Sequence, residues 1–361
     1  MQAVVGGGGT GLGTVATGIV EGLLAYHPEH DYVHLYPRDD PHQGLSSAWE
    51  RVRWEQWGLP RRLRQEGRVD LFHSPALCPP LRSPVPVVAT VYDFIPLTHP
   101  GSVGRGLSAL YFTRLLPAAL RRADALLCIS QHVMEEAQSV LGVPRDRLHL
   151  LPMFPSPKLA ATAERFVAGP EEPSWERGEV ILTYGTHEER KNFAAVIGAY
   201  ARLPEGLRRR FRLVVAGRTT PHTRELRELA RRLGVEGQVD FPGYVEGDRL
   251  AMLIARAAAG ISLSRAEGFG LIPLELAAFG VPSVVSDIPP HREAYGGLLP
   301  LVAPDDVEGA SQRLAGLLEG EMGASEMARV REELTSRYNL RRAADACVEC
   351  YLAVLGKAEA G

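Results

Sequence analysis

The sequence predicts an α/β protein with two successive domains, each built on a doubly wound parallel sheet. Short apolar segments alternate with helical segments along most of the chain, which is typical of parallel sheets covered by helices on both faces. A length of 361 residues suits about two domains. Residues 156–178 break the alternation with several Pro, Glu and Gly, so we expect a linker there. The expected domains are therefore residues 1–165 and 166–339.

The expected elements follow this alternation in order. In the first half the strands are expected at Ala3–Val5, Asp31–Tyr36, Val69–His73, Val85–Val91 and Ala125–Ser130, and the helices at Thr14–Tyr26 and Leu107–Arg122. In the second half the strands are expected at Val180–Tyr184, Leu213–Ala216, Val239–Phe241, Ala259–Ser264 and Pro282–Ser286, and the helices at Phe193–Leu203, Arg224–Leu233 and residues 340–356.

The segment from Ser264 to Glu275 carries the most specific pattern in the chain. Residues 267–270 read Glu-Gly-Phe-Gly and must form a tight turn, because glycine allows backbone angles that a Cβ forbids. Pro273 suits the first turn of a following helix. The turn therefore lies at the carboxyl end of a strand, where open α/β sheets bind their ligands.

This layout suits a sugar and a phosphate. The N–H groups of Leu271 and Ile272 at the helix start favour an anion, and Glu267 and Glu275 can accept hydrogen bonds from hydroxyls. Plainer interpretations exist, because Glu275 could simply favour the helix N-terminus and Glu267 could be a solvated loop residue. The glycines and the two glutamates taken together favour the ligand site.

Arg190 and Lys191 stand between an expected strand and an expected helix. Cations directly before a helix N-terminus are disfavoured by the helix dipole unless an anion lies between them. A diphosphate would fit, with Arg190 bidentate and Lys191 as a point charge. Asn192 is a suitable N-cap for the helix. A solvated surface pair is the alternative.

The motif Ser264-x-x-Glu267-Gly-Phe-Gly270, followed by Glu275, resembles the signature of glycosyltransferase family 4, the retaining GT-B enzymes. The resemblance extends over most of the chain. It implies two Rossmann-like domains facing a cleft, with the last helix (340–361) packed back on the first domain. It also implies that the second domain holds a nucleotide-sugar and the first holds the acceptor.

The resemblance assigns roles to individual positions. Glu267 would bond the donor sugar, Arg190 and Lys191 the diphosphate, and Glu275 the ribose. The other donor-side positions that it implies are Gly11, Gly13, Gly243, Tyr244, Val245, Gly268, Phe269, Gly270, Leu271 and Ile272. The acceptor-side positions are Tyr92, Asp93 and Ser130, with Tyr92 in the place of a histidine that is usual in the family. Asp93 could equally cap a strand end.

The glycine-rich segment Gly6–Gly13 supports a second interpretation. It contains G-x-G-x-x-G at Gly6, Gly8 and Gly11, with Asp39 and Asp40 after the next expected strand, a pattern typical of dinucleotide binding. An NAD-dependent enzyme therefore remains an alternative. A catalytically idle nucleotide-sugar-binding relative is another, suggested by Tyr92.

Composition excludes other classes. The net charge of −3 gives no general reason for nucleic-acid binding, and no stretch approaches a membrane span. With no secretory signal in view, we expect a cytoplasmic protein. The cysteines, including the Cys347-x-x-Cys350 pair, lack a second pair or a histidine pair for a zinc site. The sequence has no Asp-x-Asp pair, so no catalytic divalent metal is expected, and no cofactor is expected besides the nucleotide-sugar co-substrate.

The sequence as a whole predicts a retaining glycosyltransferase. It would move a sugar from a UDP-, GDP- or dTDP-sugar to an acceptor hydroxyl or amine. The helix containing Arg105, Arg114, Arg121 and Arg122 is most simply a solvated face, and contact with an anionic membrane is the alternative.

Overall fold

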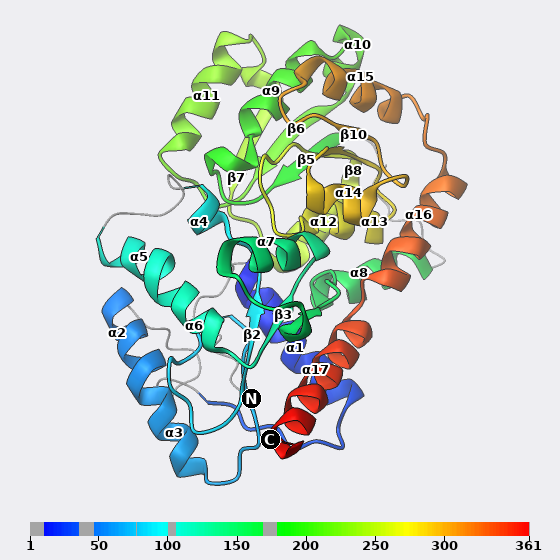
Figure 1. Ribbon diagram of the computed structural model, residues 1–361. Coiled ribbons are helices and arrows are strands. Elements are labelled where there is room, and N and C mark those ends of the chain that lie inside the picture. The colour runs from blue at the N-terminus through cyan, green and yellow to red at the C-terminus, as the bar shows by residue number, and fades with distance from the viewer. Residues whose placement is uncertain (1–10, 36–46, 77, 100–105, 169–178, 361) are drawn as a thin grey trace. The chain divides into compact units, whose positions relative to one another are not determined.

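The computed structural model describes residues 11–35, 47–76, 78–99, 106–168 and 179–360 (Figure 1). The chain forms two compact units. Unit 1 comprises Met1–Phe154 together with Tyr338–Gly361, and unit 2 comprises Pro155–Arg337. The expected strand at 3–5, the first glycines of the loop and Asp39 and Asp40 lie outside the described residues.

Unit 1 contains a parallel sheet in which the described strands follow sequence order, β1-β2-β3-β4. The strands are β1 (Phe72–Ser74), β2 (Val87–Val91), β3 (Ala125–Cys128) and β4 (Leu148–Leu150). The helices are α1 (Gly11–Tyr26), α2 (Ala48–Arg53), α3 (Leu59–Glu66), α4 (Ile95–Thr98), α5 (Leu107–Leu110), α6 (Leu116–Arg122), α7 (Gln131–Leu141) and α17 (Leu340–Ala360). Two π-helical turns, η1 (Trp54–Gly58) and η3 (Tyr111–Leu115), and a 3₁₀ turn, η4 (Arg145–Arg147), complete it.

Several local expectations for unit 1 were wrong. Residues 31–35, the described part of the strand expected at Asp31–Tyr36, form no strand. The helix expected to begin at Thr14 begins at Gly11, so Gly11 and Gly13 lie in its first turn rather than in a loop. Glycine tolerates helical angles there at a modest entropic cost. The helix expected at 107–122 is interrupted by the π turn η3.

The C-terminal helix α17 packs against α1 within unit 1. His73 in the middle of β1 bonds the Tyr351 hydroxyl of α17 through Nδ1 (2.7 Å) and Thr90 of β2 through Nε2 (2.8 Å). Burial lowers the pKa of His73 to about 3, so the imidazole is neutral and structural. Cys347 and Cys350 are buried thiols on α17.

Unit 2 contains a six-stranded parallel sheet of order β10-β9-β8-β5-β6-β7. The strands are β5 (Val180–Tyr184), β6 (Arg212–Ala216), β7 (Val239–Gly243), β8 (Ala257–Ser262), β9 (Ser283–Ser286) and β10 (Leu301–Val302). The helices are α8 (Pro157–Ala168), α9 (Phe193–Arg202), α10 (Glu205–Arg210), α11 (His222–Arg232), α12 (Gly247–Arg256), α13 (Leu271–Ala278), α14 (Pro289–Tyr295), α15 (Val307–Leu318) and α16 (Ala324–Arg337). The 3₁₀ turns are η5 (Glu189–Lys191) and η6 (Glu236–Gln238).

Helices cover both faces of this sheet. Ile181 of β5 is buried on one face with residues of α9, α11 and α15. The next residue, Leu182, is buried on the other face with residues of α8, α12 and α13. Successive strand residues point to opposite faces, so this separation of two cores is the doubly wound arrangement that the apolar strands predict.

The expected linker at 156–178 was wrong over its first half, where α8 forms. Leu159 and Ala163, one helical turn apart, are buried in the core of unit 2. The expected domain boundary at 165/166 falls inside this helix. Two apolar positions among polar neighbours are too weak a pattern to reveal a helix before its packing partner is known.

In the sheet of unit 2, the order in which the chain adds strands reverses between β5 and β8. From β5 the chain proceeds through β6 to β7 at one edge, and from β8 through β9 to β10 at the other. β5 and β8 are parallel neighbours, so their carboxyl ends lie side by side. Such a switch in strand order is where open α/β sheets place their ligands. Across the described residues no helix is both long and apolar enough to cross a membrane.

Candidate functional site

The candidate site lies at the carboxyl ends of β5 and β8, where the loop after β8 turns into α13. Gly270 precedes α13 with φ of 89°. A Cβ at this position would lie 2.2 Å from Nε2 of His291, so only glycine fits. Because Gly270 has no side chain, it cannot cap the helix, and the helix N-terminus keeps its partial positive charge.

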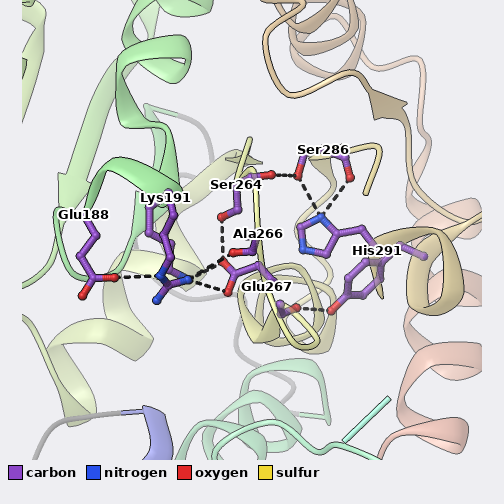
Figure 2. A network of polar contacts seen from close by, with 10 residues as sticks. Glu188, Lys191, Ser264, Ala266, Glu267, Ser286 and His291 are labelled. Carbon is purple, nitrogen blue, oxygen red and sulfur yellow. Dashed lines mark hydrogen bonds and ion pairs between the residues drawn. The ribbon is translucent and has the colours of Figure 1, made fainter. Parts of the chain in front are cut away.

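Glu267 is held by two cations and a hydroxyl (Figure 2). Lys191 donates from Nζ to Oε1 (2.5 Å), Arg190 donates from Nη1 to Oε2 (3.1 Å), and Ser264 donates from Oγ to Oε1 (2.7 Å). The side chain of Glu267 is 10% exposed. The sequence separation of about 76 residues between acid and cations is closed by the adjacency of β5 and β8.

The charge of Glu267 follows from these contacts. Burial by itself raises the pKa of the carboxyl, but Lys191, Arg190 and the hydrogen bonds from Lys191 and Ser264 outweigh it and lower the pKa to about 2. The carboxylate is therefore ionised near neutral pH and can only accept hydrogen bonds. It is a fixed anionic acceptor beside two cations.

Arg190 also fixes the loops around the acid. Its Nε donates to Glu188 (2.9 Å), and its Nη1 donates to the backbone oxygen of Ala266 (3.3 Å). The expectation that the side chain of Asn192 caps the following helix was wrong. Asn192 has φ of 54°, which turns its side chain away from the helix amides, and its Nδ2 donates to the Pro304 carbonyl instead (2.8 Å).

Glu275 lies one turn into α13 in a different environment. The Tyr184 hydroxyl donates to its Oε2 (2.6 Å), and the Ser156 N–H points at its Oε1 (3.4 Å). Burial raises the pKa of Glu275, while the bonds from Tyr184 and Ser156 oppose the rise. Tyr184 was missed by sequence reasoning, although a tyrosine ending a buried strand is a signal, because its hydroxyl needs a partner.

A second layer of side chains supports the loop from α14 and β9. The Ser286 hydroxyl donates to the Ser264 carbonyl (2.7 Å), and Nδ1 of His291 lies 3.0 Å from the Ser286 carbonyl. That carbonyl can only accept, so Nδ1 carries the hydrogen and the buried Nε2 faces Gly270 with its lone pair. Burial lowers the pKa of His291 to about 4.

Phe269 and Tyr295 complete this support. The two rings meet edge to face, with centroids 6.0 Å apart, and the Tyr295 hydroxyl donates to the Gly270 carbonyl (2.5 Å). The Phe269 side chain is therefore part of the packing, so a ligand at this loop would meet the backbone rather than the Phe269 ring. Sequence reasoning missed Ser286 and Tyr295, because nothing local connects them with the loop.

Two glycines lie at the carboxyl ends of β6 and β7, the next two strands beyond β5 in the sheet. Gly217, after β6, has its Cα so close to the loop after β5 that a Cβ would lie 1.7 Å from the Gly185 oxygen. Its N–H donates to the carbonyl of Gly243 at the end of β7 (2.7 Å). Tyr244 is 45% exposed, and its hydroxyl donates to Glu246. Gly243, Tyr244 and Val245 thus lie at the same edge of the sheet as the Glu267 loop, three strands away.

The acceptor-side candidates all make backbone contacts inside unit 1. The Tyr92 hydroxyl donates to the Pro75 carbonyl (2.5 Å), and burial raises the pKa of Tyr92, so it stays neutral. Asp93 accepts the Ile95 N–H (3.0 Å), and Ser130 caps α7 by accepting the Val133 N–H (3.1 Å). Each follows a strand at its carboxyl end.

Known proteins match both halves of the chain. A model of Glycosyltransferase Family 4 matches residues 14–154, and a model of Glycosyl transferases group 1 matches residues 170–335. The O-antigen chain mannosyltransferase B of Escherichia coli is 29% identical over 218 residues. That match covers 58% of this chain and 56% of the relative, so the chain spans about half of that relative's length.

Solved structures show the same fold at low identity. WaaG, a glycosyltransferase of lipopolysaccharide biosynthesis, superposes with a TM-score of 0.67 at 18% identity, over 94% of this chain and 96% of its own. HepE of Anabaena superposes with a TM-score of 0.60 at 17% identity, over 81% of this chain and 80% of its own. The two sheets, their helices and the paired family matches lead to one conclusion: the chain belongs to glycosyltransferase family 4 and has the two α/β domains of the GT-B fold.

Proposed function

We propose that the protein transfers a sugar from a nucleotide-sugar to an acceptor hydroxyl or amine with retention of the anomeric configuration. The observation that carries this proposal is the ionised Glu267, held by Lys191 and Arg190 beside the uncapped start of α13. Support comes from the Anabaena relative, whose structure holds UDP and glucose, and from the E. coli relative, which is named a mannosyltransferase.

Glu267 is suited to orient the donor sugar. An ionised carboxylate accepts hydrogen bonds from sugar hydroxyls, and its own partners keep it from rotating. The sugar would thus be placed against the loop backbone of residues 268–270.

Charge stabilisation of the departing diphosphate is assigned to Lys191, Arg190 and the first amides of α13. Lys191 presents three N–H donors, so it can bond Glu267 and a phosphate together. Leu271 and Ile272 contribute backbone N–H groups at the positive end of the helix. Preorganised charge of this kind is the main route by which such a site lowers a barrier. We propose that no metal is required, because these groups supply the positive charge.

Glu275 is assigned to the ribose. Its Oε2 is bonded by Tyr184, whereas its Oε1 has only the long contact to Ser156, so Oε1 is the oxygen that a ribose hydroxyl would approach. The acceptor is assigned to unit 1, near Asp93 and Ser130, after β2 and β3.

Lys191→Ala is the decisive test of this function. A screen of UDP-, GDP- and dTDP-sugars by thermal shift first identifies the donor. With that donor, Lys191→Ala should lower kcat about 100-fold or more, because one preorganised cation at the leaving group is lost. Product NMR on the parent enzyme should show the anomeric configuration of the donor.

Lys158→Ala is the matched control, because Lys158 is an exposed lysine of α8 in the same unit. It should retain the parent turnover. Near-normal turnover in Lys191→Ala would remove this residue from the site, and an inverted product would overturn the proposed retention.

A further inference from the structure

Two neighbouring helices of unit 1 expose large apolar side chains. On α2 and the π turn that follows it, Trp49 is 58% and Trp57 is 61% exposed. On α5, Leu107 is 43% and Leu110 is 56% exposed. α5 packs beside α2, as Figure 1 shows. We call these four residues the Trp–Leu surface. Single exposed apolar side chains are ordinary, but four on two touching helices are not.

Within each of the two helical segments, the local geometry brings the exposed apolar side chains towards one direction. Leu107 and Leu110 are three positions apart and so share a helix face. Trp49 and Trp57 are eight positions apart, which in a regular α-helix would separate them by about a quarter turn. The π turn at Trp54–Gly58 takes in one residue more than an α turn, which brings Trp57 back towards the direction of Trp49.

The helices that carry this surface are strongly basic. Residues 47–68 and 106–122 contain nine arginines, three glutamates and no lysine or aspartate, although the whole chain has a net charge of −3. Arg53, Arg61, Arg62 and Arg64 are exposed, as is Arg114 of η3. The positive charge therefore lies next to the exposed tryptophans and leucines.

One of the three glutamates is buried and helps to hold the surface together. Glu55 of η1 accepts the Tyr111 hydroxyl of η3 through both oxygens (2.8 and 3.0 Å). Burial raises the pKa of Glu55 to about 8, against the opposing effects of Tyr111 and Arg51. Glu55 is therefore largely protonated at neutral pH and does not offset the arginines.

We infer that the Trp–Leu surface is a docking site for an anionic lipid bilayer. Tryptophan and leucine insert at the level between headgroups and acyl chains, while arginines reach the lipid phosphates from the flanks. A bilayer requires no groove, only a basic face with exposed apolar side chains, and both are present here. This inference does not depend on the proposed transfer reaction.

Vesicle binding of the full chain tests the inference. The protein is co-sedimented with vesicles of phosphatidylcholine containing phosphatidylglycerol, and with phosphatidylcholine alone, at low and high salt. Binding should require phosphatidylglycerol and weaken with salt. The double variant Trp49→Ser with Trp57→Ser, and the triple variant of Arg61, Arg62 and Arg64 to Ser, should each lower the bound fraction about tenfold.

Matched variants separate this surface from general effects. Leu352→Ser removes an apolar side chain of α17 that is 57% exposed, and the triple serine variant of Arg224, Arg231 and Arg232 removes exposed arginines of α11. Both should bind vesicles as the parent does, and circular dichroism should show all variants folded. Equal binding by every variant, or no binding by the parent, would overturn the inference. The inference would also be overturned if vesicles bound no protein and light scattering showed a dimer of the parent that the tryptophan variant does not form.

Discussion

The two units each contain a buried strand that turns into a helix, yet the two turns are built differently. In unit 1, Ser130 follows β3 with φ of −156° and caps α7 with its own hydroxyl. In unit 2, Gly270 lies in the left-handed region before α13 and has no side chain to offer. The first helix N-terminus is satisfied from within the chain. The second keeps its positive end for another group, and cations and a carboxylate surround it.

Strand order explains the difference. The described strands of unit 1 follow one another in sequence order, whereas unit 2 reverses direction between β5 and β8. Only at such a reversal do the loops from two neighbouring strands leave in opposite directions and open a space between them. A strand-to-helix turn is therefore common to both units, but a charged site forms at the one beside the reversal.

Gly270→Ala should give the largest effect on stability. The alanine would adopt a positive φ and place its Cβ against the His291 ring, costing about 3 kcal/mol or more in total. Gly142→Ala, at the end of α7, also has a positive φ (69°) but no atom within 4 Å of the new Cβ, so it should cost only about 1 kcal/mol. Urea unfolding measures the stability of both variants. Equal losses of unfolding free energy would mean that the His291 ring moves aside without an energetic cost.

Acid should weaken unit 2 through Glu267. Its folded pKa of about 2 lies below the ordinary value of 4.5, so its stabilising contribution is complete above pH 4.5 and is lost as the pH falls towards 2. The shift corresponds to about 3 kcal/mol. Unfolding free energies measured between these pH values should fall less steeply in Glu267→Gln. Glu275→Gln should not flatten the same slope, because the pKa of Glu275 is raised. Parallel slopes in the parent and Glu267→Gln would disprove the ion pair.

Ser130→Ala should produce the smallest change. Loss of the cap on α7 should destabilise unit 1 by about 1 kcal/mol, and Ser130→Gly by only a few tenths of that. Thermal unfolding of the two variants measures the difference. Neither substitution removes an acid or a base, so the acid dependence of stability should match the parent. A loss of several kcal/mol would show that the Ser130 hydroxyl does more than cap.

Local patterns predicted much of unit 2 because they act over a few residues. The strand expected at Val180–Tyr184 is observed at those positions, and α13 begins after the glycine turn as expected. Patterns of two or three residues gave wrong predictions where tertiary packing determines the secondary structure, as in α8 and at residues 31–35. Tyr184, Ser286 and Tyr295 escaped notice for the same reason, since their partners lie far away in the sequence.

The sequence by itself determined the two α/β units, the glycine turn before α13 and the residue types of the candidate site. These features depend on backbone preferences and on the period of apolar residues, both of which act locally. Only the tertiary structure decided that Lys191 and Arg190 meet Glu267 and that Tyr184 meets Glu275. Those contacts exist because β5 and β8 lie side by side, and strand adjacency is fixed by the packing of the whole sheet.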